Sequence, residues 1–222
     1  MKTKERGKKL LFLGKVCVLS FVLWTILIQK VDVQPCGVNG TDIGLATINL
    51  WFHRLTGVHK KLYSITDWLG LIPICICMMF AGIGLRQWIK RRNLRKVDLD
   101  IVLLGIYYII VISGYLLFER IPINYRPILL EGVLEVSYPS STTLLVLCVM
   151  MSFVEQMNRS LKNIAMKQMT EAITICFSVF MVVGRMLSGV HWFTDIIGSI
   201  ILSTGLFLVY KGTVLLCCGK EK

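Results

Sequence analysis

Charged residues are scarce in this chain of 222 residues, and proline is scarcer still. Asp, Glu, Lys and Arg together make up 17% of the sequence, against about 25% in a typical soluble domain. There are 5 prolines, whereas 55% of the residues are hydrophobic. The apolar excess excludes an intrinsically disordered chain and argues against an ordinary soluble enzyme. The composition instead favours one bundle of membrane helices, each of which needs about 20 residues to cross a bilayer.

Metal-binding and disulfide patterns are also missing. The chain has 3 histidines and 8 cysteines, and no spacing between them fits a zinc site. Most of the cysteines lie inside apolar runs, where cysteine behaves as a small hydrophobe. We therefore expect no metal site and no disulfide scaffold.

Six apolar runs predict an all-α fold, a single integral membrane domain over residues 1–222. The predicted spans lie at about residues 10–29, 67–85, 101–118, 142–154, 172–187 and 195–210. The first run is long for a signal peptide and no small-x-small cleavage site follows it, so we interpret it as a span. Between the first two spans, segment 43–58 mixes apolar with small and polar residues, which predicts an outer helix lying in the membrane interface. An ordinary covering loop is the alternative.

The net charge of +12 is distributed in short basic runs between the apolar ones. Six spans put both termini on one side of the membrane. That side carries 17 of the 25 Lys and Arg residues, the opposite side carries 7, and Lys15 lies inside the first span. The excess marks the richer side as cytoplasmic. We therefore expect a protein of the plasma membrane whose partner is the lipid bilayer and not nucleic acid.

Three polar segments, far apart in sequence, fall at the outer membrane face. They are Arg126-Pro127, the stretch Tyr138-Pro139-Ser140-Ser141-Thr142-Thr143, and the set Arg185, His191 and Asp195. Ionisable residues at helix ends within a membrane bundle are costly and are a functional-site hypothesis by default. Taken singly, each has an ordinary alternative: a headgroup anchor for the arginines, a helix cap for the serines and a hydrogen-bonded side chain for the histidine. The shared face and the Arg-x5-His-x3-Asp spacing favour a common site.

Together these residue types suit phosphoryl transfer. Arg126 and Arg185 can clamp a phosphoryl group through forked donors. The hydroxyl groups of the helix start can add donors to the same oxygens; they belong to Ser140, Ser141 and Thr142. His191 can act as a nucleophile or a general acid/base. Asp195, four residues on, can hold one ring nitrogen so that the other is free to attack and form a phosphohistidine.

At these residues the chain resembles the type-2 phosphatidic acid phosphatase family, also called lipid phosphate phosphatases. The third motif of that family, Ser-Arg-x5-His-x3-Asp, is matched by Gly184-Arg185, His191 and Asp195. The resemblance covers about residues 119–198 and the six-span layout. It implies dephosphorylation of lipid phosphates or polyprenyl pyrophosphates without a metal or other cofactor. His191 would be the nucleophile, Asp195 its orienting carboxylate, and Arg126 and Arg185 the phosphate clamp.

The chain departs from the other two motifs of the family. In Lys-x6-Arg-Pro, Arg126-Pro127 is present but Glu119 occupies the lysine position, so Arg120 beside it is a candidate replacement. In Pro-Ser-Gly-His, Pro139-Ser140 is followed by Ser141-Thr142. Threonine cannot protonate a leaving group as histidine does, which favours a pyrophosphate lipid, whose phosphate leaves readily. A different acid (Tyr138, Tyr125 or water) is the alternative.

The sequence therefore predicts a membrane lipid phosphatase with an outward-facing site. Two alternatives stay open: a catalytically weak relative that binds phosphorylated lipid, and a phosphotransferase that passes the phosphoryl group to another alcohol. A channel or transporter is disfavoured, since the middles of the predicted spans lack charged residues.

Overall fold

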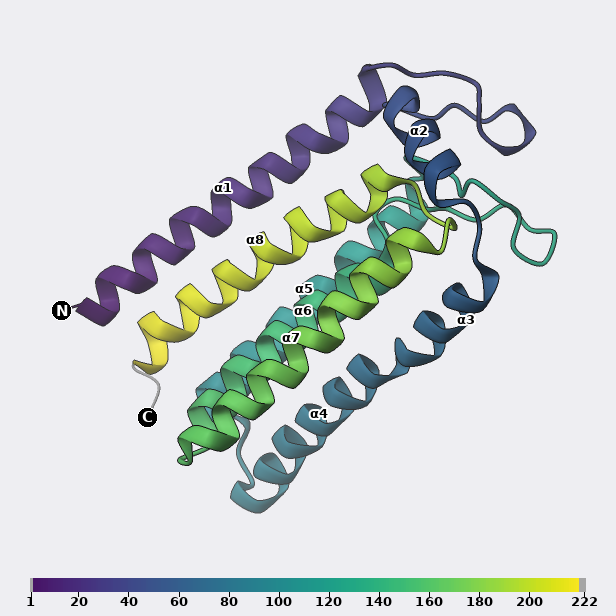
Figure 1. Cartoon of the computed structure of the whole chain (residues 1–222). Helices are drawn as coiled ribbons and strands as arrows, with labels where there is room; N and C mark the ends of the chain where they lie inside the picture. Colours follow the sequence, from purple (N-terminus) through teal and green to yellow (C-terminus); the bar gives the residue numbers. More distant parts are fainter. Residues whose placement is uncertain (1, 220–222) are drawn as a thin grey trace.

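The protein is a bundle of long helices with shorter helices at one end (Figure 1), seen in a computed structural model that describes residues 2–219. The eight α-helices are α1 (Lys2–Lys30), α2 (Ala46–Thr56), α3 (Lys60–Leu69), α4 (Leu71–Arg91), α5 (Leu99–Arg120), α6 (Ser141–Ser160), α7 (Ile164–Leu187) and α8 (Phe193–Cys218). No strand forms among the described residues, which confirms the all-α prediction. Met1, the first residue of the predicted domain, and Lys220 and Lys222, counted among the cytoplasmic charges, lie outside the described residues.

Within the described residues, five stretches are long and apolar enough to cross a membrane. They are Thr3–Lys30, Lys60–Arg91, Leu99–Arg120, Ile164–Leu187 and Phe193–Cys218. The start of α1 and the end of α8 lie at the same end of the bundle, and α2 lies at the other (Figure 1). Helix α6, which covers the predicted fourth span, is not among these five stretches.

Helix α6 is a long helix of the described residues that is not apolar enough to count as a membrane span. It packs against α4, α5, α7 and α8, so its sides face protein and need less apolar surface. It also runs beyond the predicted end at residue 154. Glu155 pairs with Arg159 at 3.0 Å and with Lys211 of α8 at 2.7 Å. Buried polar side chains that are paired cost little, so the helix continues past its apolar run.

The predicted second span, 67–85, includes a helix break. Helix α3 ends at Leu69 and α4 begins at Leu71, with Gly70 between them. Pro73 lies in the first turn of α4, where its missing N–H costs nothing, but its ring would obstruct the carbonyl of Leu69 in a continuous helix. The break allows α3 to turn toward the site end of the bundle.

Helices α1 and α8 pack closely along most of their length, as Figure 1 shows. Gly14 of α1 lies where a Cβ atom would be 2.8 Å from the backbone nitrogen of Val209 and 2.9 Å from the carbonyl oxygen of Gly205. Only glycine permits this approach, and small residues of this kind are typical of helix contacts in membranes. The first predicted span is thus an integral part of the bundle.

Helix α2, at the position of the predicted interfacial helix, fixes the start of α8. The side-chain amide of buried Asn49 donates to Thr194 Oγ1 at 3.0 Å, and the Thr194 backbone N–H donates to Asn49 Oδ1 at 3.2 Å. His53 Nε2 lies 3.2 Å from the carbonyl oxygen of Gly189. These contacts hold the α7–α8 loop, which carries His191.

Candidate active site

The imidazole of His191 is buried in the α7–α8 loop with one nitrogen bonded and one free. Its Nδ1 atom lies 3.1 Å from the carbonyl oxygen of Ser137. A carbonyl can only accept, so Nδ1 carries the proton and Nε2 carries the lone pair of the neutral ring. His191 Nε2 is buried and has no hydrogen-bond partner among the described residues. A lone pair at Nε2 is therefore available for chemistry.

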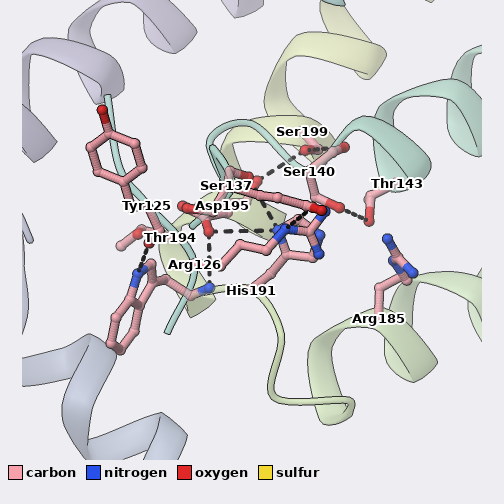
Figure 2. A network of polar contacts seen from close by, with 12 residues as sticks. Tyr125, Arg126, Ser137, Ser140, Thr143, Arg185, His191, Thr194, Asp195 and Ser199 are labelled. Carbon is pink, nitrogen blue, oxygen red and sulfur yellow. Dashed lines mark hydrogen bonds and ion pairs between the residues drawn. The ribbon is translucent and has the colours of Figure 1, made fainter. Parts of the chain in front are cut away.

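Asp195 approaches His191 but does not hold its ring as the sequence suggests. The Oδ2 atom of Asp195 lies 3.7 Å from His191 Nδ1, beyond hydrogen-bond distance, and accepts the backbone N–H of Trp192 at 2.9 Å. Asp195 lies in the first turn of α8, where a carboxylate satisfies free N–H groups and complements the helix dipole. Figure 2 shows Asp195 beside the imidazole, and Ser137 is the residue that orients it.

Arg126 reaches the same place from the loop between α5 and α6. Its backbone N–H donates to the carbonyl oxygen of Glu135 at 3.0 Å, and its Nε lies 3.1 Å from Glu135 Oε2. Its Nη1 atom is buried and has no hydrogen-bond partner among the described residues. In Figure 2 its guanidinium lies next to the ring of His191.

Arg185, near the end of α7, has a long charged side chain that is 1% exposed. Its Nη1 lies 3.3 Å from Asp67 Oδ1, and its guanidinium carbon lies 4.8 Å from the centre of the Tyr63 ring. Its Nε has no hydrogen-bond partner among residues 2–219. Sequence reasoning missed Tyr63 and Asp67, because α3 is polar, short and more than 110 residues from Arg185.

Burial and positive charge lower the pKa of His191. Removal of the ring from water is the largest cause, and the charges of Arg126 and Arg185 act in the same direction. The hydrogen bond to the Ser137 carbonyl opposes them. His191 is therefore a neutral imidazole at neutral pH, which is the form that a histidine nucleophile would require.

The hydroxyl-bearing residues at the start of α6 have different surroundings. The Ser140 hydroxyl donates to Thr143 Oγ1 at 3.0 Å, and the Ser140 carbonyl accepts from Ser199 of α8 at 2.9 Å. Ser140 therefore joins α6 to α8. Ser141 lines the cavity that His191 faces. Thr142 lies beside Gly70, at the junction of α3 and α4.

A cavity of about 100 Å³ lies over the imidazole. Its polar lining includes Tyr115, Glu119, Arg126, Glu135, Ser141 and His191. Among the described residues lining it, there is no second histidine and no arginine besides Arg126. The predicted candidate Arg120 is exposed at the end of α5, and Glu119 takes the lining position. No cluster of His, Cys, Asp or Glu suited to a metal ion occurs in residues 2–219.

The two tyrosines considered as substitute acids have other contacts. The buried Tyr138 hydroxyl is hydrogen-bonded to Thr25 of α1 at 2.8 Å, and burial raises the pKa of Tyr138. The carbonyl oxygen of Tyr125 accepts from the Trp192 indole at 2.7 Å. Figure 2 shows the Tyr125 hydroxyl pointing away from His191. Neither hydroxyl is aimed at His191.

The chain is similar to one protein family and to one solved structure, and it matches no curated protein. The family model of the PAP2 superfamily matches residues 75–215. Among solved structures, the first transmembrane PAP2-type phosphatidylglycerolphosphate phosphatase from Bacillus subtilis is similar to this chain, with a TM-score of 0.59 and 17% identity. The match covers 90% of this chain and 94% of that one.

The family match covers the predicted motifs, the cavity and the five helices from α4 to α8, and the structural match shows the same fold over nearly the whole chain. The apolar helices and this fold make the protein an integral membrane protein with the fold of a membrane phosphatase. The suspected resemblance is thereby confirmed: the chain belongs to the PAP2 superfamily.

Proposed function

We propose that this protein removes a phosphoryl group from a phosphorylated lipid by way of a phosphohistidine on His191. One observation carries the proposal. Three buried nitrogens, His191 Nε2, Arg126 Nη1 and Arg185 Nε, lack partners among the described residues. His191 and Arg126 line one small cavity, and the charge of Arg185 lies near enough to lower the pKa of His191. Buried donors without partners are costly. A phosphoryl group would satisfy the two arginines and present its phosphorus to the lone pair of His191.

The reaction follows from these roles. The Nε2 lone pair attacks phosphorus, the bond from phosphorus to the leaving oxygen breaks, and the leaving group departs with a proton from its surroundings. Arg126 and Arg185 stabilise the charge on the remaining phosphoryl oxygens. The proton on Nδ1 stays on the ring and remains hydrogen-bonded to the Ser137 carbonyl, so the positive charge that forms on the ring lies between Ser137 and Asp195. Water then breaks the phosphorus–nitrogen bond and releases phosphate.

The lack of a histidine acid to protonate the leaving group favours a pyrophosphate lipid over a monoester as the substrate. Thr142 stands where the family has a histidine acid, and no second histidine is among the described residues lining the cavity. A phosphate leaves without a strong acid, whereas an alkoxide does not. A lipid phosphate monoester, the class acted on by the similar Bacillus subtilis enzyme, is the competing substrate.

The test is phosphate release by purified protein in lipid vesicles. The substrates are a polyprenyl pyrophosphate, the matching monophosphate and phosphatidic acid. We expect release to be fastest from the pyrophosphate, and His191→Ala to lower it by about a thousandfold or more. His59→Ala is the matched control, since His59 is an exposed histidine that hydrogen-bonds Thr56 outside the cavity. Faster release from the monophosphate contradicts the substrate preference, and unchanged release by His191→Ala contradicts the mechanism.

Two alternatives give other outcomes in the same assay. Lipid binding without turnover supports a catalytically weak relative, which the missing acid histidine favours. Product that forms only with an added alcohol supports a phosphotransferase. Either outcome would replace hydrolysis as the function.

The topology proposed with this function has six crossings, cytoplasmic termini and an extracytoplasmic site in the plasma membrane. The excess of Lys and Arg on the side of the termini supports it. Epitope tags at each terminus should be accessible only after cells are permeabilised. Labelling of either tag in intact cells would contradict this orientation.

A further inference from the structure

Helix α3 lies outside residues 75–215, which match the superfamily, yet its side chains contact the phosphate clamp. We propose that α3 is part of the phosphate site and that Tyr63 is its positioning residue, a ring that holds the two clamp arginines side by side. The proposal rests on the proposed function, since it concerns how this site binds a phosphoryl group.

Both clamp arginines face one aromatic ring. The guanidinium carbon of Arg185 lies 4.8 Å from the centre of the Tyr63 ring, and that of Arg126 lies 5.8 Å from it. Two buried cations repel one another, and here each is 7% exposed or less. The face of an aromatic ring carries negative potential and attracts a cation within about 6 Å. Tyr63 therefore offsets the repulsion between Arg126 and Arg185 in the absence of bound phosphate.

Asp67, one turn further along α3, pairs with one of the two arginines. Its Oδ1 atom lies 3.3 Å from Arg185 Nη1, while Arg185 Nε has no partner among the described residues. The same helix thus fixes Arg185 from two directions, by a ring and by a carboxylate. The contact leaves one edge of the guanidinium available to a ligand.

The position of α3 depends on Gly184, which replaces the serine of the family motif. A Cβ atom at residue 184 would lie 2.7 Å from Thr66 Cγ2 and 3.6 Å from Leu62. The Thr66 hydroxyl donates to the carbonyl oxygens of Leu62 and Tyr63 at 3.0 and 2.9 Å, so its side chain is not free to turn aside. The missing side chain at residue 184 lets α3 approach Arg185 closely.

The start of α3 is anchored to the loop that carries His191. The backbone N–H of His59 donates to the carbonyl oxygen of Ser188 at 2.9 Å. The start of α3 therefore lies next to the α7–α8 loop, which carries His191.

The first experiment measures binding of inorganic phosphate to the purified full-length protein in detergent by calorimetry, which needs no turnover. We expect Tyr63→Leu to weaken binding about 5- to 30-fold, and Tyr63→Phe to stay within about twofold because the ring face remains. Trp68→Leu is the matched control, since Trp68 lies on the same helix and is 72% exposed. Equal binding by Tyr63→Leu and the wild type would overturn the proposal.

A second series separates an electrostatic role from a structural one. Phenylalanines with one, two and three fluorine atoms are placed at position 63; they keep the shape of the ring and progressively remove the negative potential of its face. We expect phosphate affinity to fall stepwise with fluorine number while the melting temperature stays constant. A constant affinity across the series would overturn the role of the ring, even if Tyr63→Leu fails to fold.

A third pair of variants tests the placement of α3. Gly184→Ser should weaken phosphate binding by pushing against Thr66, and Thr66→Ser in the same chain should restore it by removing the Cγ2 methyl group. Failure of the double variant to recover would count against the proposal. If the wild type binds phosphate but hydrolyses no lipid phosphate, the proposed function is wrong, and the α3 variants still test the role of Tyr63. If the wild type binds no phosphate, the proposed function and the role of Tyr63 are both wrong.

Discussion

The carbonyl oxygen of Ser137 lies 3.1 Å from Nδ1 of His191, and this contact orients the imidazole. The side chain expected in that place, Asp195, lies 3.7 Å away and caps α8 through the Trp192 backbone N–H. A neutral carbonyl fixes the tautomer as a carboxylate would. It does not neutralise the positive charge that develops on the ring, so Asp195 retains an electrostatic role at a slightly greater distance.

The first prediction separates these two roles of Asp195. Asp195→Asn should keep the helix cap, since asparagine caps well, and should lower kcat because a negative charge beside the ring is lost. We expect a loss of about 10- to 100-fold, below the roughly 10⁴-fold loss where a carboxylate alone sets the tautomer. Steady-state kinetics measures the loss.

Asp195→Ala is the companion variant. It should lower kcat similarly and also lower stability by about 1 kcal/mol through loss of the cap. A fall of 10⁴-fold with Asp195→Asn would mean that Ser137 does not hold the ring during the reaction.

The second prediction concerns pH. The pKa of His191 is lowered by burial and by the two arginines, and the neutral ring is the proposed nucleophile. Activity should therefore persist as pH falls through about 6.5, the ordinary value for histidine, and decline only below it. Profiles of kcat/KM against pH report this ionisation in the free enzyme.

Removing one arginine should move that profile. Arg126→Gln should shift the acid limb of the residual activity to higher pH, because one positive charge near the ring is gone. Arg54→Gln, the same change at an exposed residue of α2, is the control and should leave the limb in place. An acid limb at or above pH 6.5 in the wild type would contradict the buried neutral imidazole.

The third prediction concerns Glu119, which lines the cavity where the family has lysine. Glu119→Lys should lower KM for a lipid phosphate about 3- to 10-fold, since an attractive charge replaces a repulsive one near the surface of the site. Glu131→Lys makes the same charge change at an exposed loop residue and should alter KM little. Similar effects from both variants would indicate general attraction of anions and not a site contact.

The fourth prediction concerns the contact between α1 and α8. Gly14→Val should lower the free energy of unfolding by about 1–3 kcal/mol, because the new atoms meet the backbone of α8 and overpacking is destabilising. The melting temperature in detergent, followed by tryptophan fluorescence, measures this. Gly114→Val in α5 is the control, since a Cβ atom there meets nothing within 4 Å.

The sequence by itself determined the helical membrane architecture and pointed to the residues of the candidate site. Apolar runs are local features, and each fixes a helix whatever its neighbours, so α1, α5, α7 and α8 are found where hydropathy predicts them. The motif residues Arg126, Arg185 and His191 meet because their spacing from helix ends puts them at one end of the bundle. The resemblance to the phosphatase family rests on that spacing, and the family match confirms it.

Tertiary structure decided what local pattern does not encode. The polar half of α6 stays helical because Glu155 finds Arg159 and Lys211, and α3 reaches the site because residue 184 lacks a side chain. The Ser137 carbonyl holds His191 across 54 residues of sequence. Apart from the Glu155–Arg159 pair, these contacts join residues distant along the chain. A polar residue looks alike in sequence whether water or a buried partner satisfies it.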